Sequence, residues 1–276
     1  PEKLETLVQS SVDQIEKLTI SAVEEAESSK EDADLIAKVV AVANDDLVNK
    51  VVEEVSKIST EEKQTLSAQV LKAIVDSDSG KIEIINEDVK GTMIKQTIQS
   101  AQNQEDGTGV QQTQDMTSIV SDIIVNTNTE TGSKMIEELN NSSTDTENDL
   151  SLQVISAISE KDTTKLNTLS ENNKEQIEKL TETAIKNADA SEESADLIAK
   201  VVANASDELV NKVVEEVSKN STEENQALSA KVMKSIVETN PEKIETLSDE
   251  NKETMITQTI EAAKNQAEGT STDEID

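Results

Sequence analysis

Apolar residues recur along the chain with the spacing of one helix face. From Leu209 to Val217 they occupy positions i, i+1, i+4, i+5 and i+8, a set that forms one stripe on a helix with about 3.6 residues per turn. In a strand, the adjacent apolar pairs would point to opposite faces. The pattern therefore predicts short amphipathic helices.

The predicted helices are clearest in the last hundred residues. They lie near 173–187, 194–204, 207–219 and 222–238, followed by a short turn at 241–247 and a helix that ends near residue 266.

Residues at the junctions fit helix starts. Ser206 is followed by the acidic Asp207 and Glu208, which suit the positive end of a helix. Ser221 with Glu224 matches a capping box. The predicted fold class is therefore all-α. The many Val, Ile and Thr residues have lower helix propensity, and they leave a β-solenoid as the alternative.

The chain contains long internal repeats. The segment LVNKVVEEVSK occurs at residues 47–57 and again at 209–219, an offset of 162 (209 minus 47). A shorter offset of 78 (212 minus 134) carries KMIEEL at 134–139 onto KVVEEV at 212–217. Four repeats follow, numbered here 1 to 4: residues 1–78, 79–162, 163–240 and the partial repeat 241–276. Repeat 2 carries a few extra residues, predicted as a loop insert at about 104–116.

Tandem repeats of short helices predict an α-solenoid, or superhelical rod. Each repeat presents an apolar stripe that it cannot bury alone, so neighbouring repeats stack to form a continuous core. Such helices are marginally stable in isolation and depend on packing.

Several residue types are absent. The chain has no Phe, Tyr, Trp, Cys or His, and all 25 basic residues are Lys. Without Cys and His, thiol chemistry and a structural zinc site are excluded. His is also the usual general base near neutral pH. We therefore expect a protein without enzymatic activity. Glu-Glu pairs that recur opposite the apolar stripes, such as 53–54 and 215–216, are predicted to lie on solvated faces.

The net charge of −33 (25 minus 58) limits the partners. Nucleic acids are not expected as partners, because binding to them depends on neutralising phosphates with Lys or Arg. No run of 18 apolar residues occurs, so membrane insertion is not expected either. Salt and divalent cations reduce the self-repulsion of such a surface.

One segment has some features of a calcium loop. In DSDSGKIEIINE, at residues 76–87, the oxygen ligands would be Asp76, Asp78 and Glu87. Gly80 stands at position five of the loop, where a helix–loop–helix calcium site has it at position six. A turn between helices is the alternative. No other cofactor is expected, and any further calcium would bind weakly to the acidic surface.

A family resemblance rests on the repeat sequences. Residues 209–225 (LVNKVVEEVSKNSTEEN) and 229–247 (SAKVMKSIVETNPEKIETL) resemble helical repeat tracts of very large bacterial surface proteins. In marine bacteria, such tracts accompany FecR-type domains, and no FecR domain is present in this sequence. The resemblance implies a structural role outside the cell or at its surface.

Two functional hypotheses follow. The first is a structural stalk, spacer or filament subunit that assembles head to tail, with copies of itself or with neighbouring repeats of a longer chain. Because the first and last repeats lack polar caps, their apolar residues form the predicted assembly interface, namely Pro1, Leu4, Leu7, Ile256, Ile260 and Ile275. The second hypothesis is a solenoid module that binds another protein in a concave groove.

Overall fold

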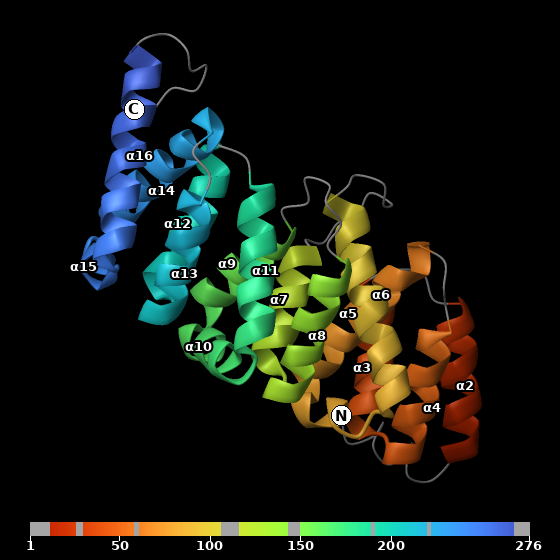
Figure 1. Ribbon diagram of the computed structural model, residues 1–276. Helices are drawn as coiled ribbons and strands as arrows, with labels where there is room; N and C mark the ends of the chain where they lie inside the picture. Colours follow the sequence, from red (N-terminus) through yellow and green to blue (C-terminus); the bar gives the residue numbers. More distant parts are fainter. Residues whose placement is uncertain are drawn as a thin grey trace. The chain divides into compact units, whose positions relative to one another are not determined.

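The computed structural model describes residues 12–25, 30–57, 61–105, 116–142, 150–188, 191–219 and 222–267. The fold is all-α, as predicted (Figure 1). The described residues contain no strand, so they give no support to a β-solenoid.

The chain divides into two compact units, and the boundary falls within helix α8. The N-terminal unit comprises residues 1–138 and the C-terminal unit residues 139–276. Helices of the N-terminal unit are α2 (Val12–Glu25), α3 (Lys30–Val42), α4 (Asp45–Ser56), α5 (Glu61–Asp78), the 3-10 helix η1 (Ser79–Ile82), α6 (Glu87–Glu105), α7 (Met116–Asn126) and most of α8 (Thr129–Ser142).

In the C-terminal unit, the helices predicted between residues 173 and 266 match the structure within about three residues at each end, whereas the predicted turn at 241–247 is mostly a short helix. Its helices are α9 (Leu150–Lys161), α10 (Thr163–Asn172), α11 (Lys174–Asn187), α12 (Glu192–Asn204), α13 (Asp207–Ser218), α14 (Glu223–Thr239), the short α15 (Glu242–Thr246) and α16 (Asp249–Ala267).

The sequence repeats identify equivalent helices. In repeats 1 to 4, in that order, the first helix is α2, α6, α11 and α16. In repeats 1 to 3, the second helix is α3, α7 and α12. In the same three repeats, the third helix is α4, α8 and α13, and the fourth helix is α5, α9 and α14. Equivalent residues are 162 apart between repeats 1 and 3. From repeat 1 to repeat 2 the offset is 78 before the insert and 84 (162 minus 78) after it. From repeat 2 to repeat 3 it is 84 before the insert and 78 after it.

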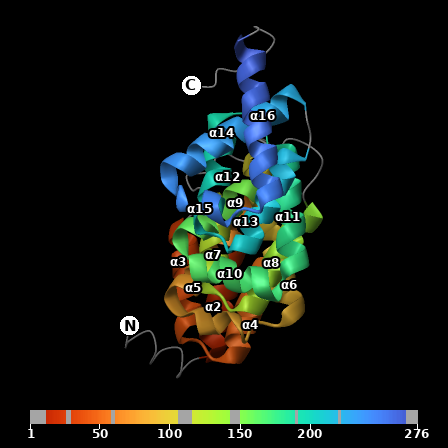
Figure 2. The ribbon, with the colours of Figure 1, turned by 60° about the vertical axis from the view of Figure 1, so that its left-hand side comes forward.

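Within each unit, helices pack mainly against their next-but-one neighbours, which creates two layers. First and third helices form one layer, in which α2 contacts α4, α4 contacts α6, α11 contacts α13, and α13 contacts α16. Second and fourth helices form the other layer, in which α3 contacts α5, α5 contacts α7, α9 contacts α12, and α12 contacts α14. Two such neighbours, α2 and α4, lie side by side in Figure 2.

The layers also contact each other at every junction between repeats. The fourth helix of one repeat packs on the first helix of the next, as α5 does on α6, α9 on α11 and α14 on α16. A helix inside a unit is therefore covered by helices that precede it and by helices that follow it. The core between the layers consists of Val, Ile, Leu, Met and Ala side chains.

Buried polar side chains recur at equivalent positions and join the two layers. The Gln96 amide donates to the carbonyl oxygen of Ser56 and accepts from the hydroxyl of Ser67. Gln258 in repeat 4 makes the same two bonds, with Ser218 and Ser229. Each amide replaces the bonds that its neighbours would make with water.

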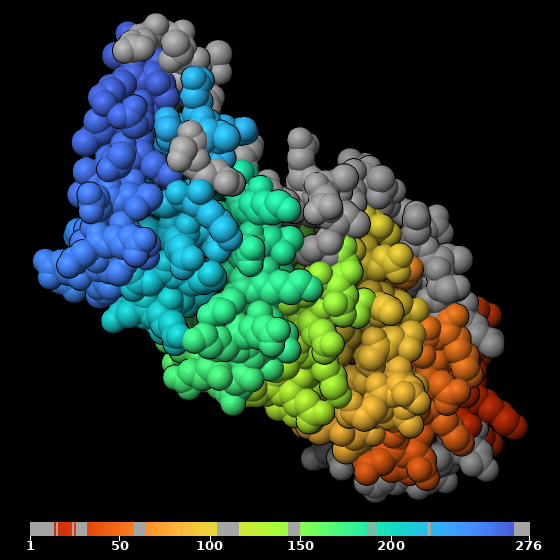
Figure 3. All heavy atoms as spheres, viewed as in Figure 1, coloured from red at the N-terminus to blue at the C-terminus, as the bar shows by residue number. Residues whose placement is uncertain are grey.

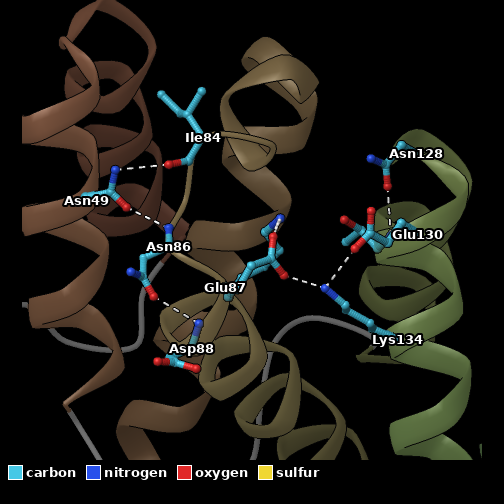
Figure 4. Close-up of polar contacts among 10 residues, drawn as sticks. Asn49, Ile84, Asn86, Glu87, Asp88, Asn128, Glu130 and Lys134 are labelled. Carbon is cyan, nitrogen blue, oxygen red and sulfur yellow. Dashed lines mark hydrogen bonds and ion pairs between the residues drawn. The ribbon is translucent and has the colours of Figure 1, made fainter.

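A second recurring set holds the chain where it enters a first helix. Asn49 donates to the carbonyl of Ile84 and accepts from the backbone N–H of Asn86 (Figure 4). Asn211 bonds Thr246 and Ser248 in the same way. These bonds fix the third helix of one repeat against the start of the next.

The helix starts confirm one predicted cap and correct another. Ser206 caps α13, and its hydroxyl accepts from the N–H of Leu209 at 3.4 Å. At α14 the cap is Thr222, whose hydroxyl accepts from the N–H of Asn225, so the predicted Ser221 was wrong by one residue. A hydroxyl side chain occupies both positions, and the sequence alone does not choose between them.

Replacing Gln258 by Ala is expected to destabilise the C-terminal unit. The change leaves the carbonyl of Ser218 and the hydroxyl of Ser229 without their partner inside the core. We expect the free energy of unfolding to fall by about 2 kcal/mol in urea titrations followed by circular dichroism. The control is Glu253→Ala, an exposed position on the same helix. Equal losses in the two variants would contradict the role given to Gln258.

Candidate functional site: two uncovered helix faces

Five large apolar side chains of the described residues are exposed, with exposed fractions between 50% and 68%. They lie in two groups, on the first helices of the N-terminal unit and on the last helices of the C-terminal unit: Leu18, Leu35, Val237, Ile256 and Ile260. We call the first group the leading face and the second the trailing face.

The trailing face lies on α14 and α16, and its equivalents in repeats 1 and 2 are buried. Val75 on α5, which is equivalent to Val237, is buried, and α7 packs on α5. Ile94 and Ile98 on α6, which are equivalent to Ile256 and Ile260, are also buried. In the N-terminal unit, α7 packs on both α5 and α6. No described helix takes the place of α7 against α14 and α16, and the surface of α16 lies open in Figure 3.

The leading face shows the reverse pattern on α2 and α3. Leu180 and Ala184 on α11 are buried, and α11 packs on α9 and α10. Their equivalents on α2, Leu18 and Ala22, are exposed. On α3, Leu35 is exposed, whereas its equivalent on α7, Ile119, is buried. The leading face is thus the side that a preceding repeat covers elsewhere in the chain.

Charged residues at the two faces match an ion pair inside the C-terminal unit. Lys200 on α12 pairs with Glu160 on α9 at 3.2 Å, where the fourth helix of one repeat meets the second helix of the next. The equivalents are Lys38 on the leading face and Glu238 on the trailing face, and both are exposed. The two faces therefore carry opposite charges at positions that pair elsewhere in the chain.

Glu87 forms a group of charges that joins the first and third helices of repeat 2. Its carboxylate accepts from Lys134 of α8 and from Lys90 at 2.8 Å (Figure 4). Hydrogen bonds from Lys134 and then Lys90 lower the pKa of Glu87 from 4.5 to about 2. Lys90 is itself buried, so Glu87 neutralises a cation that has little access to water.

The residues of the candidate calcium loop take part in separate interactions. Asp76 pairs with Lys72, and Asp78 accepts from the N–H of Gly80 at the start of η1. Glu87 binds the two lysines described above. Within the described ranges, no three acidic side chains are grouped so that they could hold a metal ion. The segment is the turn between α5 and α6.

A cleft in the C-terminal unit is lined partly by charged side chains. Its volume is about 250 Å³, and its lining includes Lys174, Glu178 and Glu208. Lys174 is paired with Glu208, and this hydrogen bond raises the pKa of Lys174. A lysine that acts as a nucleophile needs a lowered pKa instead, so this side chain stays a cation.

The predicted interface lies only partly within the described residues. Ile256 and Ile260 belong to the trailing face, whereas Pro1, Leu4, Leu7 and Ile275 lie outside the described residues. Sequence reasoning missed Leu18, Leu35 and Val237. The sequence alone does not show that these side chains are exposed. Their equivalents in other repeats, Leu180, Ile119 and Val75, are apolar as well, and those are buried.

One of the Glu-Glu pairs corrects the prediction of solvated faces. Glu216 is buried, and it pairs with Lys212 at 3.2 Å and with Lys219 at 3.1 Å. Lysines one turn before and one turn after the carboxylate compensate for its loss of water.

Comparisons with known proteins add no family. No family model matches the sequence, and no curated protein matches it. A solved engineered protein of the Northeast Structural Genomics Consortium is similar over 97% of this chain and 96% of its own, with 14% identity and a TM-score of 0.32. At that score the similarity carries no argument about fold or function. None of the described helices is long and apolar enough to span a bilayer.

Replacing Glu87 by Gln is expected to lower stability in a pH-dependent way. Because the folded-state pKa lies below the ordinary value, the carboxylate stabilises the fold above about pH 4.5, and this contribution is lost as the pH falls toward 2. At pH 7 we expect a loss of at most about 1 kcal/mol, since Glu87 is largely exposed.

Chemical unfolding between pH 2 and pH 7 measures the free energy of unfolding of the unmodified protein and of Glu87→Gln. The difference between the two free energies should decrease to zero as the pH falls from 4.5 to 2. The control is Asp249→Asn, which alters the equivalent residue of repeat 4. A difference that stays constant over this pH range would contradict the assignment.

Proposed function

We propose that the protein is a non-catalytic structural repeat protein that assembles head to tail, as a stalk, spacer or filament subunit outside the cell or at its surface. One observation carries the proposal. The large exposed apolar side chains of the described residues all lie on α2 and α3, near the start of the chain, or on α14 and α16, near its end. At equivalent positions elsewhere in the chain, such side chains are covered by a neighbouring repeat.

The contact proposed between copies follows an internal precedent. Inside the C-terminal unit α12 packs on α9, and inside the N-terminal unit α7 packs on α5, so a second helix covers a preceding fourth helix in both. The same arrangement between two copies places α3 of one copy on α14 of the next. Leu35 then covers Val237, and Lys38 lies near Glu238. The contact uses different surfaces of the two copies, so it generates an open chain unless the rotation closes it.

The expected affinity is low. Burying the remaining half of a large apolar side chain contributes about 1 kcal/mol, so five such side chains supply about 5 kcal/mol. Association costs about 4 kcal/mol or more in lost freedom of motion. These five side chains alone leave about 1 kcal/mol, which corresponds to a dissociation constant of about 0.2 M, so assembly below 1 mM requires further contacts between the two helix faces.

Salt is expected to favour assembly. Two chains that each carry a net charge of −33 repel one another. The screening length falls from about 8 Å at 0.15 M salt to about 3 Å at 1 M, while the apolar contact remains. The acidic composition therefore suits assembly in seawater-like salt. An environment of that kind also fits the surface proteins that the repeats resemble.

Replacing Val237 by Asp is expected to abolish assembly. The change adds a charge at the centre of the proposed contact, and the dissociation constant should rise at least tenfold. The measurement is size-exclusion chromatography with light scattering, between 10 μM and 1 mM protein and in 0.15 M and 1 M salt. Leu35→Asp, on the leading face, is expected to have the same effect.

The matched control is Thr164→Asp, which adds the same charge at an exposed position of α10. This variant should assemble like the unmodified protein. If the unmodified protein remains a monomer at 1 mM in 1 M salt, the head-to-tail proposal is wrong. If Val237→Asp and Thr164→Asp behave alike, the contact lies elsewhere.

A further inference from the structure

Continuous stacking of two copies meets one conflict, and this conflict points to a specific mechanism. Helix α16 is the first helix of repeat 4, and α2 is the first helix of repeat 1. When α3 of one copy packs on α14 of another, both α16 and α2 are placed where a single first helix belongs. At the internal junction of repeats 2 and 3, α11 alone occupies this position, in contact with α9 and α13.

We propose that α16 of one copy replaces α2 in the next copy, so that assembly occurs by exchange of one helix between copies. This inference rests on the head-to-tail function proposed above and names the partner of the trailing face, which is the α3–α4 pair of a second copy. After the exchange, α16 lies between its own α14 and the α4 of the following copy. The order of helices through the junction is then the order found at α9, α11 and α13.

The side chains of α16 fit this place better than its present exposed position. Its trailing side carries Ile256, Ile260 and Asp249. The equivalents on α6 are Ile94, Ile98 and Glu87. Both isoleucines of α6 are buried, and Glu87 pairs with Lys134 of α8, which is a third helix.

Helix α4 presents the matching residue. Lys50 is the equivalent of Lys134, at an offset of 84 (134 minus 50). In the single copy, Lys50 pairs with Glu16 of α2 at 2.8 Å. The exchange gives Lys50 a new carboxylate, Asp249 of α16, in place of Glu16. Charge is therefore conserved at the contact, while two exposed isoleucines become covered.

Helix α2 is suited to release because described helices cover only one of its sides. It packs on α4, with contacts to α3, and buries Val23. Leu18 and Ala22 on its other side are exposed, whereas α11 is covered on both sides. Detaching α2 therefore gives up fewer apolar contacts than detaching an internal first helix would.

The test exploits the opposite effects expected from the two helices. Val23→Asp weakens the attachment of α2 to α4, so it should lower the protein concentration at half-assembly at least fivefold. Val23→Ala should have a smaller effect in the same direction. Ile256→Asp places a charge on the exchanged face of α16 and should raise that concentration at least tenfold. Full-length proteins are compared by sedimentation velocity, and circular dichroism checks their helix content.

The double variant Val23→Asp with Ile256→Asp separates exchange from misfolding. It should remain a monomer, because the association promoted by a loosened α2 depends on α16. If the double variant associates as strongly as Val23→Asp alone, that association is nonspecific and the exchange is contradicted.

The remaining outcomes distinguish the exchange from the proposed function. If the unmodified protein assembles, Val237→Asp prevents this, and Val23→Asp leaves it unchanged or weakens it, then stacking occurs without exchange. That result would contradict the helix exchange but would agree with the proposed head-to-tail assembly. If the unmodified protein does not assemble at 1 mM in 1 M salt, the proposed function and the exchange are both contradicted.

Discussion

Every helix of this fold needs apolar neighbours on two sides, and the composition makes this requirement strict. Without Phe, Tyr or Trp, the core is built from thin layers of Val, Ile, Leu, Met and Ala, so no single helix pair encloses much apolar surface. The helix α11 illustrates the requirement, since it buries Leu180 and Ala184 and packs on α9, α10 and α13. Among the described residues, α2, α3, α14 and α16 each have a side that no described helix covers, and the exposed apolar residues lie there.

Polar groups determine how the layers are aligned, while the overall charge limits how strongly copies associate. Gln96 and Gln258 join the layers at equivalent positions, and Asn49 and Asn211 hold the chain at the start of α6 and α16. These bonds occur at the junctions of repeats 1 and 2 and of repeats 3 and 4, so those two junctions share the same polar contacts. The net charge of −33 opposes association in the absence of salt. A weak, salt-dependent contact between copies is the combined expectation.

The helices were predictable because their apolar stripes follow the helical period over many residues, as in α13. The five predicted helices of residues 173–266 are all present, whereas the predicted turn at 241–247 is mostly the short helix α15. The uncovered faces were only partly predictable. Leu18 and Leu180 are the same residue type at equivalent positions, and only packing distinguishes them. The burial of Glu216 also depends on packing, because the lysines at 212 and 219 are visible in the sequence but the depth of the carboxylate is not. Ser221 and Thr222 both carry a hydroxyl that could cap a helix, and the structure identifies Thr222 as the cap.

Amide hydrogen exchange, followed by mass spectrometry at increasing protein concentration, tests most directly whether another copy covers the uncovered faces. In 1 M salt between 10 μM and 1 mM, exchange should slow in residues 30–42 and 249–267, which form α3 and α16, while residues 207–218 of the internal helix α13 stay unchanged. Equal exchange at all concentrations, or protection confined to internal helices, would contradict the account.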